Sequence, residues 1–236
     1  AWTGAPLMVV EADESDGTYR ELPLRGAIVT NIDVDHLDHF GTFDELQSDF
    51  AAFMAGVDGP VVVGWDDEIA RRVARIADPR RLLTYGTASS CAIRWNDVDA
   101  RGDAMIFTVH GPFGRRSVRL PLRGIHNVAN ACGALTLATE VGVDIDEAIG
   151  GIESFAGVGR RFDVVGRADG ATFVDDYAHL PREIAAVLAA ARAGGEWKRV
   201  VAVFQPNRYN RMATMAAEYG DAFVDADVVV LTDIYS

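Results

Sequence analysis

Short apolar runs followed at once by acidic residues and histidines dominate the first forty residues of the chain. Leu7–Val10 is followed by Glu11, Asp13 and Glu14, and Ala27–Ile32 is followed by DVDHLDH. Buried strands of a parallel sheet have this apolar character. Ligands of open α/β sheets bind just beyond the carboxyl ends of the strands, so we predict a site at these two ends. The crowded carboxylates require a cation between them, and a divalent metal ion would serve.

Helical and extended periods alternate along the next hundred residues. Thr42 and Glu45 fit a capping box at the start of a helix. A later helix is expected to turn Ile69, Val73 and Ile76 inward. Between residues 91 and 122, apolar and polar positions alternate and are separated by Asp, Gly and Pro, which predicts a small antiparallel sheet. The other predicted elements are strands at 60–65 and 82–85 and helices at 42–57, 66–77, 127–141 and 145–154.

The composition shifts at Gly157–Arg161, and we place a domain boundary near Val158. This divides the chain into domains at 1–157 and 158–236. In the second domain, predicted strands alternate with predicted helices, as in a βαβ unit, so the expected fold class is α/β. Because the chain begins almost inside a strand and stops just after one, we expect both domains to be incomplete. The second-domain elements are strands at 171–174, 199–204 and 228–232 and helices at 181–193 and 211–224.

Composition and charge narrow the function classes. The 236 residues are 49% hydrophobic and 24% charged, as in a globular protein. A net charge of −13 argues against nucleic acid as the main partner. Cys91 and Cys132 lack metal-ligand spacing and are expected to be reduced thiols of a cytoplasmic protein. With no long apolar run and no basic N-terminal region, neither a membrane span nor a signal peptide is predicted.

Six motifs, in family order along almost the whole chain, resemble those of the Mur ligases. These are ATP-dependent enzymes that form amide bonds in peptidoglycan synthesis. SDGTY after EADE resembles the alanine-adding branch of the family rather than the branch that recycles murein tripeptide. The resemblance implies a central ATP-binding domain, with a mostly parallel sheet and a small antiparallel one, and a partial Rossmann-like second domain. The motifs are EADESDG (11–17), TNIDVDHLD (30–38), HNVANACGA (126–134), GVGRRF (157–162), DDYAHLP (175–181) and FQPNRYNR (204–211).

The resemblance implies a reaction in two steps. The lactyl carboxylate of UDP-N-acetylmuramate attacks the γ-phosphate of ATP, giving an acyl phosphate and ADP, and the amine of L-alanine then displaces phosphate. Metal ions and arginines are needed to bring these negative charges together. Three alternatives stay open: glycine or L-serine as the acceptor, a tripeptide-recycling or folyl-polyglutamate-type ligase, and a nucleotide-binding module without chemistry.

The metal residues implied by the resemblance are Glu11, for the Mg²⁺ that bridges the ATP phosphates, and His36, for a second metal position. A carboxylate suits Mg²⁺, whereas imidazole favours Mn²⁺ somewhat. The alternative is that these side chains cap the following loops. Several Mur ligases carry a carbamylated lysine on the next helix, where it assists the metal ion. Lys198 is the only lysine of this chain and lies far from that helix in the sequence, so a carbamylated lysine is excluded. Capping is our preferred interpretation for Asp13, Glu14, Asp16, Asp35, Asp38 and His39.

The nucleotide residues implied by the resemblance are His126, Asn127 and Asn130, which would hold the adenine. The two amides lie three positions apart on one helical face and can point the same way. Helix capping by Asn127 and a buried polar contact of Asn130 are the alternative. Arg160 and Arg161 resemble the nucleotide-contacting arginines of the family, and of these we favour Arg161.

The second domain supplies the remaining candidates. Asp176, or its neighbour in the DDYAHLP motif, is expected to meet the ribose hydroxyls. Tyr177 and His179 resemble residues on the amino-acid and phosphate side of the site. Arg208 and Arg211 are expected to clamp the alanine carboxylate or the acyl phosphate, with a salt-bridged surface face as the alternative.

Three departures from the family pattern bear on activity. Leu180 and Asn207 stand where the family more often has histidine, which leaves His179 as the one imidazole in these two motifs. The base that deprotonates the alanine ammonium is therefore not identified. The chain contains no glycine-rich loop ending in GK[ST] to cradle phosphates, so we expect it to be inactive alone.

Overall fold

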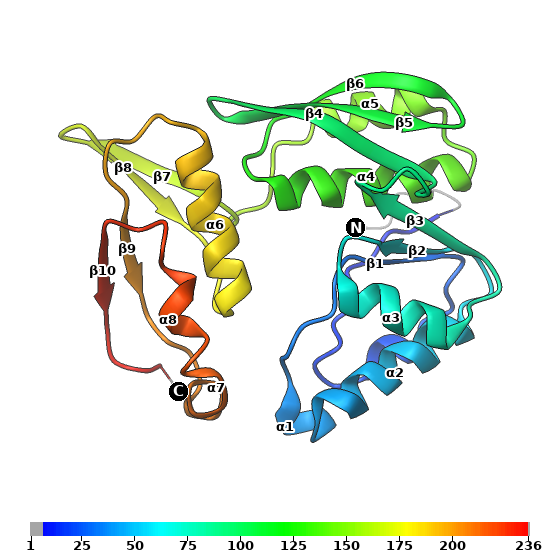
Figure 1. Ribbon diagram of the computed structural model, residues 1–236, viewed down its shortest axis with the longest axis horizontal. Coiled ribbons are helices and arrows are strands. Elements are labelled where there is room, and N and C mark those ends of the chain that lie inside the picture. The colour runs from blue at the N-terminus through cyan, green and yellow to red at the C-terminus, as the bar shows by residue number, and fades with distance from the viewer. Residues whose placement is uncertain (1–6, 236) are drawn as a thin grey trace.

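A six-stranded sheet forms the centre of the larger part of the molecule (Figure 1). The structure is a computed structural model that describes residues 7–235. Strands β1 to β4 are parallel, whereas β4, β5 and β6 are antiparallel and continue the same sheet. Both the parallel strands at 60–65 and 82–85 and the antiparallel strands are thus confirmed. In sheet order the strands are β1 (Ala27–Val29), β2 (Val61–Gly64), β3 (Leu82–Gly86), β4 (Ile93–Arg101), β5 (Ala104–Gly111) and β6 (Gly114–Leu120).

Helices cover both faces of this sheet because its central strands are apolar on both sides. Val61 and Val63 belong to the core beneath α2 (Phe43–Gly56) and α3 (Glu68–Ala77). Val62, between them, points to the other face and packs with α4 (Ile125–Glu140) and α5 (Ile145–Glu153). This alternation is the two-residue period of a strand.

The predicted capping box of α2 is confirmed. The Thr42 hydroxyl accepts from the backbone N–H of Glu45, and the Glu45 carboxylate accepts from the backbone N–H of Thr42. The inward position predicted for Ile76 on α3 is wrong, since 71% of this residue is exposed. The helix approaches the sheet through Ala70, Val73 and Ala74, which rotates Ile76 toward solvent.

The strand predicted at Leu7–Val10 is absent, and Val9 is 97% exposed. Within residues 7–235, β1 pairs only with β2 and no strand lies along its other edge. An apolar run becomes a strand only where a neighbouring backbone accepts its hydrogen bonds. The segment instead leads into the short 3-10 helix η1 (Thr18–Glu21), and the DVDH motif leads into the one-turn helix α1 (Leu37–Phe40).

The smaller, C-terminal part contains one βαβ unit and one hairpin. Strands β9 and β10 are parallel and adjacent, as predicted, but β8 pairs with β7, a strand the sequence analysis missed. The turn between β7 and β8 is Asp169-Gly170, with both residues at positive φ, a pattern typical of hairpins. The elements are β7 (Asp163–Ala168), β8 (Ala171–Asp175), α6 (Pro181–Ala193), β9 (Val201–Phe204), α7 (Tyr209–Met215), α8 (Tyr219–Ala222) and β10 (Val228–Leu231).

The single helix predicted at 211–224 is in fact two helices, α7 and α8. A tertiary contact holds the second one. The Tyr219 hydroxyl donates to the carbonyl of His179 at 2.6 Å, and the Tyr219 ring stacks on Phe204. These contacts fix α8 against the core of the C-terminal part independently of α7.

Both cysteines are buried thiols outside any disulfide. Among residues 7–235, no helix combines the length and the apolar character that crossing a membrane requires.

Candidate functional site

A pocket of about 820 Å³ opens at the carboxyl end of β1, between the two parts of the molecule. Segment 28–36, which contains the end of β1 and most of the TNIDVDHLD motif, contributes most of one wall. The opposite wall comes from residues that follow β8 and β9. All the side chains predicted to be catalytic or metal-binding line this one pocket: Glu11, His36, Tyr177, His179, Arg208 and Arg211.

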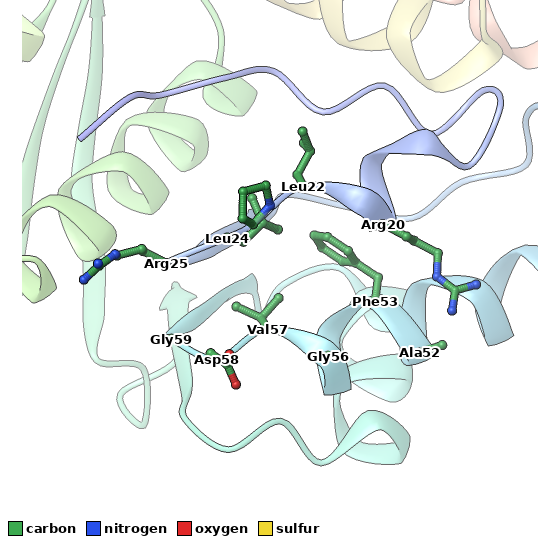
Figure 2. Close-up of a pocket in the computed structure, with 11 residues that line it drawn as sticks. Arg20, Leu22, Leu24, Arg25, Ala52, Phe53, Gly56, Val57, Asp58 and Gly59 are labelled. Atoms are coloured by element: carbon green, nitrogen blue, oxygen red, sulfur yellow. The ribbon is translucent and has the colours of Figure 1, made fainter. Parts of the chain in front are cut away.

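A second pocket, of about 680 Å³, lies at the amino ends of β1 and β2 (Figure 2). Figure 2 shows Leu22, Leu24, Phe53 and Val57 around it, with Arg25 at one side. It contains none of the predicted site residues. Since ligands of such sheets bind at the carboxyl ends of the strands, the first pocket is the candidate site.

Asp35 joins the two walls of the first pocket. Arg211 donates from Nη2 to both carboxylate oxygens, at 2.9 and 3.1 Å, and the backbone N–H of His36 donates to Oδ1 at 2.8 Å. Burial alone would raise the pKa of Asp35, but the contacts with His179, Arg211 and this N–H outweigh it and lower the pKa. Asp35 is therefore an anion held by cationic and N–H donors.

Two histidines face this carboxylate from opposite walls. His36 Nε2 lies 3.4 Å from Asp35 Oδ2 and 3.6 Å from Glu14 Oε1. His36 has a positive φ of 54°, a strained conformation that often marks functional positions. His179 Nε2 lies 3.8 Å from Asp35 Oδ2, and the Asp35 carboxylate raises the pKa of His179.

Arginines of the C-terminal part face the other aspartates of the motif. Arg182 contacts Asp33 at 3.4 Å and Asp67 at 3.0 Å, and Arg208 lies 3.6 Å from Asp38. The sequence analysis expected a metal ion to compensate this crowded strand end. At the end of β1, arginine side chains already compensate the aspartates. The argument that negative charge requires a metal ion therefore rests only on the acids around Glu11.

The side chains of the pocket fit Mg²⁺ only if water and phosphate oxygens supply most of its ligands. Within residues 7–235, no three His, Cys, Asp or Glu side chains converge closely enough to hold a metal ion. Mg²⁺ commonly takes one or two carboxylates and completes its shell with water and phosphate oxygens. Glu11, which is exposed at the pocket, could supply such a carboxylate, and His36 lines the same space.

The residues predicted to hold adenine lie at the start of α4. Gly124 precedes the helix at φ 91°, and a Cβ there would lie 2.5 Å from the His126 ring, so glycine leaves room for this side chain. The Asn127 amide donates to the carbonyl of Arg123 at 2.7 Å and lies 3.2 Å from His126 Nε2. His126 Nδ1 is buried and has no partner among the described residues, and burial lowers the pKa of His126. Asn130 is exposed, so the alternative of a buried polar contact is wrong.

The C-terminal part places Asp176 beside this group. Its carboxylate accepts from the N–H groups of Phe162 and Ala178, at 2.7 and 2.8 Å. The Phe162 ring lies 5.6 Å from the guanidinium carbon of Arg123, which directly precedes Gly124, so Asp176 is held close to the start of α4. Burial is the main cause of the lowered pKa of His126; the charge of Arg161 also lowers it, and that of Asp176 opposes it. The predicted nucleotide residues thus come from both parts and meet at their junction.

Tyr177 links the nucleotide group to the pocket. Arg160 and Arg161 both lie over its ring, at 4.8 and 5.7 Å from the ring centre. The Tyr177 and His179 rings are 5.2 Å apart, edge to face. The chain of contacts therefore runs from Arg161 through Tyr177 and His179 to Asp35.

Sequence reasoning missed Asp35 and Arg182 as site residues. Among the backbone N–H groups of the described residues, Asp35 accepts only that of His36 and does not cap α1, and its contacts with Arg211 and His179 could not be read from spacing. One signal was available: Val34, an apolar residue inside an acidic motif, packs against the core of the C-terminal part.

Two protein-family models match the chain, one in each of its two parts. The model of the Mur ligase middle domain matches residues 3–138, and that of the Mur ligase, glutamate ligase domain matches residues 160–235. The boundary near Val158 falls between these matches and stays a prediction.

Among curated proteins, the chain is 44% identical over 241 residues to a UDP-N-acetylmuramate–L-alanine ligase of Thermobifida fusca, covering 98% of this chain and 51% of that protein. Among solved structures, it is similar to the UDP-N-acetylmuramate–alanine ligase of Thermotoga maritima, with a TM-score of 0.76, 28% identity, and 95% and 49% of the two chains covered. A MurF ligase of the same organism, solved with ADP, shares the fold at a TM-score of 0.72 and 18% identity, with 88% and 48% covered. The chain thus spans about half the length of these relatives.

Proposed function

This chain belongs to the Mur ligase family, and on that premise we propose that it forms the middle and C-terminal parts of an ATP-dependent, ADP-forming ligase acting in the cytoplasm. The proposed reaction joins L-alanine to the lactyl carboxylate of UDP-N-acetylmuramate in peptidoglycan synthesis. One observation carries the proposal: the six residues predicted to be catalytic or metal-binding line one pocket at the carboxyl end of the sheet. The 44% identity to an alanine-adding ligase supports this choice of acceptor.

The reaction begins with attack of a lactyl oxygen on the γ-phosphorus of ATP, and the bond to the β-phosphate oxygen breaks to release ADP. The alanine amine then attacks the acyl carbon, phosphate leaves, and the nitrogen loses its proton. Each step brings anions together, so the pocket must supply positive charge. A bound Mg²⁺, held by Glu11 with His36 nearby, would shield the phosphate oxygens.

Arg211 and Arg208 are the proposed clamps for the alanine carboxylate or the acyl phosphate. Arg211 uses Nη2 for Asp35, while its Nε is buried and has no partner within residues 7–235. That Nε therefore retains an unused donor, which a substrate oxygen reaching this wall of the pocket would satisfy. Arg208 is exposed and pairs only loosely with Asp38, so it can turn toward a substrate. We assign His179 and Tyr177 to the same side of the pocket.

The nucleotide is proposed to lie across the junction of the two parts. His126, Asn127 and Asn130 would hold the adenine, and Asp176 would meet the ribose. Each Asp176 oxygen accepts one backbone N–H and retains a lone pair for a hydroxyl. Arg161 is exposed next to this group, and its guanidinium suits phosphate oxygens.

A chimera tests the whole proposal. In the chimera, this chain replaces the matching segment of the Thermobifida fusca relative. The rest of the relative then supplies a phosphate loop and the flanking regions. ADP release is then measured with UDP-N-acetylmuramate and, in turn, L-alanine, glycine, L-serine and murein tripeptide. We expect release that requires both the UDP-sugar and L-alanine, and preference for another acceptor would reassign the substrate.

The 236-residue chain alone is the matched control. Because it contains no GK[ST] loop, we expect it to bind Mg²⁺–ADP without releasing ADP from ATP. Binding without turnover in the chimera as well would favour a nucleotide-binding module, and alanine-dependent turnover by the chain alone would contradict the requirement for the loop.

A further inference from the structure

Arg123 is a nearly buried cation at the junction of the two parts. It precedes α4, and only 7% of it is exposed. Its Nη2 donates to Glu196 Oε2 at 2.6 Å. Its guanidinium carbon lies 4.8 Å from the ring centre of Trp197 and 5.6 Å from that of Phe162. The Arg123 side chain thus extends from the larger, N-terminal part of the molecule and contacts three residues of the C-terminal part.

The backbone of Arg123 belongs to the adenine half of the proposed nucleotide site. Its carbonyl accepts from the Asn127 amide at 2.7 Å, and that amide also contacts His126. This carbonyl thereby sets the orientation of the Asn127 amide group. Any shift of residue 123 would be transmitted to the side chain proposed to face the adenine.

The rings around the guanidinium belong to the ribose and phosphate half. Phe162 donates its N–H to Asp176 at 2.7 Å and directly follows Arg161 in the chain. Trp197 is held by a hydrogen bond from its Nε1 to the hydroxyl of Thr172, on β8, at 3.0 Å. The surface that receives the guanidinium is therefore itself fixed to the strand that leads to Asp176.

We propose that Arg123 is a positioning residue that holds the two halves of the nucleotide site in register. Its side chain fixes the Phe162–Asp176 side, and its carbonyl fixes the Asn127 side. The proposal rests on the proposed function for the nucleotide, while the mechanical link between the halves stands on these contacts alone.

Arginine suits this position better than lysine. A planar guanidinium stacks on aromatic rings while donating in its plane to a carboxylate, which an ammonium cannot do. The space is also tight, since a Cβ on Gly194 would lie 2.4 Å from Arg123 Nη1. Gly194 has an ordinary helical φ of −69°, so alanine there would displace the guanidinium without straining the backbone.

The test compares Arg123→Met, Arg123→Lys and Gly194→Ala with the unchanged chain. Hydrogen exchange is followed without nucleotide, and ADP affinity is measured by calorimetry with Mg²⁺. Arg192→Met is the matched control, because Arg192 pairs with Asp227 at 2.6 Å entirely within the C-terminal part. We expect Arg123→Met and Gly194→Ala to speed exchange at both 124–131 and 160–163, with β2 and β5 unchanged.

ADP binding should weaken about tenfold in Arg123→Met, which is equivalent to about 1.4 kcal/mol. It should weaken less in Arg123→Lys and should be unchanged in Arg192→Met. Gly194→Ala should have no further effect when added to Arg123→Met. Unchanged exchange at either segment, or equal acceleration throughout the chain, would overturn the link. Failure of the unchanged chain to bind ADP would contradict the proposed nucleotide site instead, and the exchange data would still decide the link.

Discussion

Arg211 donates from one nitrogen to both carboxylate oxygens of Asp35, although the two residues are 176 positions apart in the chain. Their side chains are only 7% and 16% exposed, so this is a nearly buried ion pair between the two parts of the molecule. It closes one side of the pocket that holds the predicted catalytic residues.

Asp35→Asn should lower the free energy of unfolding by about 2 kcal/mol, because Arg211 then keeps a buried charge without its anion. Asparagine retains an oxygen for the N–H of His36, so the change isolates the charge. Urea unfolding at pH 7 measures the effect. Asp38→Asn is the matched control: its pair with Arg208 is more than half exposed, and the change should cost less than about 0.5 kcal/mol. Equal effects of the two substitutions would refute the prediction.

The pH dependence of stability should carry a contribution from His179. Asp35, the Tyr177 carbonyl and Glu183 raise the pKa of His179 above its ordinary 6.5, against the opposing effects of burial and Arg211. Because the pKa of His179 is higher in the folded than in the unfolded protein, protonated His179 stabilises the fold, and this contribution is complete below pH 6.5. It is lost as the pH rises through the folded-state pKa of His179.

His179→Gln should therefore cost most stability near about pH 5.5 and progressively less at higher pH. Urea titrations of both proteins between about pH 5.5 and 9 measure the difference. A difference that stays constant, or grows with pH, would show that His179 is not stabilised as a cation.

Metal-dependent nucleotide binding should require His36 and not His39. His36 lines the pocket, whereas His39 packs edge to face on Phe40 outside it. In calorimetric titrations with ADP and either Mg²⁺ or Mn²⁺, His36→Gln should weaken binding about tenfold, and more with Mn²⁺. Glu11→Gln should act similarly, and more strongly with Mg²⁺. Equal losses in His36→Gln and His39→Gln would contradict a metal role for His36.

Thr42→Ala should lower the free energy of unfolding by about 1 kcal/mol, because it removes the acceptor for the Glu45 N–H at the start of α2. Ser48→Ala is the control. The Ser48 hydroxyl donates only to the carbonyl of Asp44 on the same helix, and its loss should change stability by less than about 0.5 kcal/mol. Thermal and urea unfolding measure both, and comparable losses would mean that the cap contributes nothing specific.

Local chemistry made several parts of the fold predictable. The capping box at Thr42, the period of α2 and the alternation of the antiparallel strands depend on residues a few positions apart, and each is confirmed. The Leu7–Val10 strand failed because a strand needs a partner that its own residues cannot provide. The hairpin signal Asp169-Gly170 was present in the sequence and was overlooked.

For the candidate site, the order of residues along the chain was enough to show which residue types follow the strands and which motifs resemble those of a ligase family. Which charges neutralise which depends on the folded chain: Arg182 and Arg211 contact aspartates of the DVDH motif from more than a hundred positions away. The fold also places Arg123 against two neighbouring aromatic rings of the other part, those of Phe162 and Trp197. Electrostatic and packing energies depend on distance in space, and residue spacing along the chain specifies that distance only within one element.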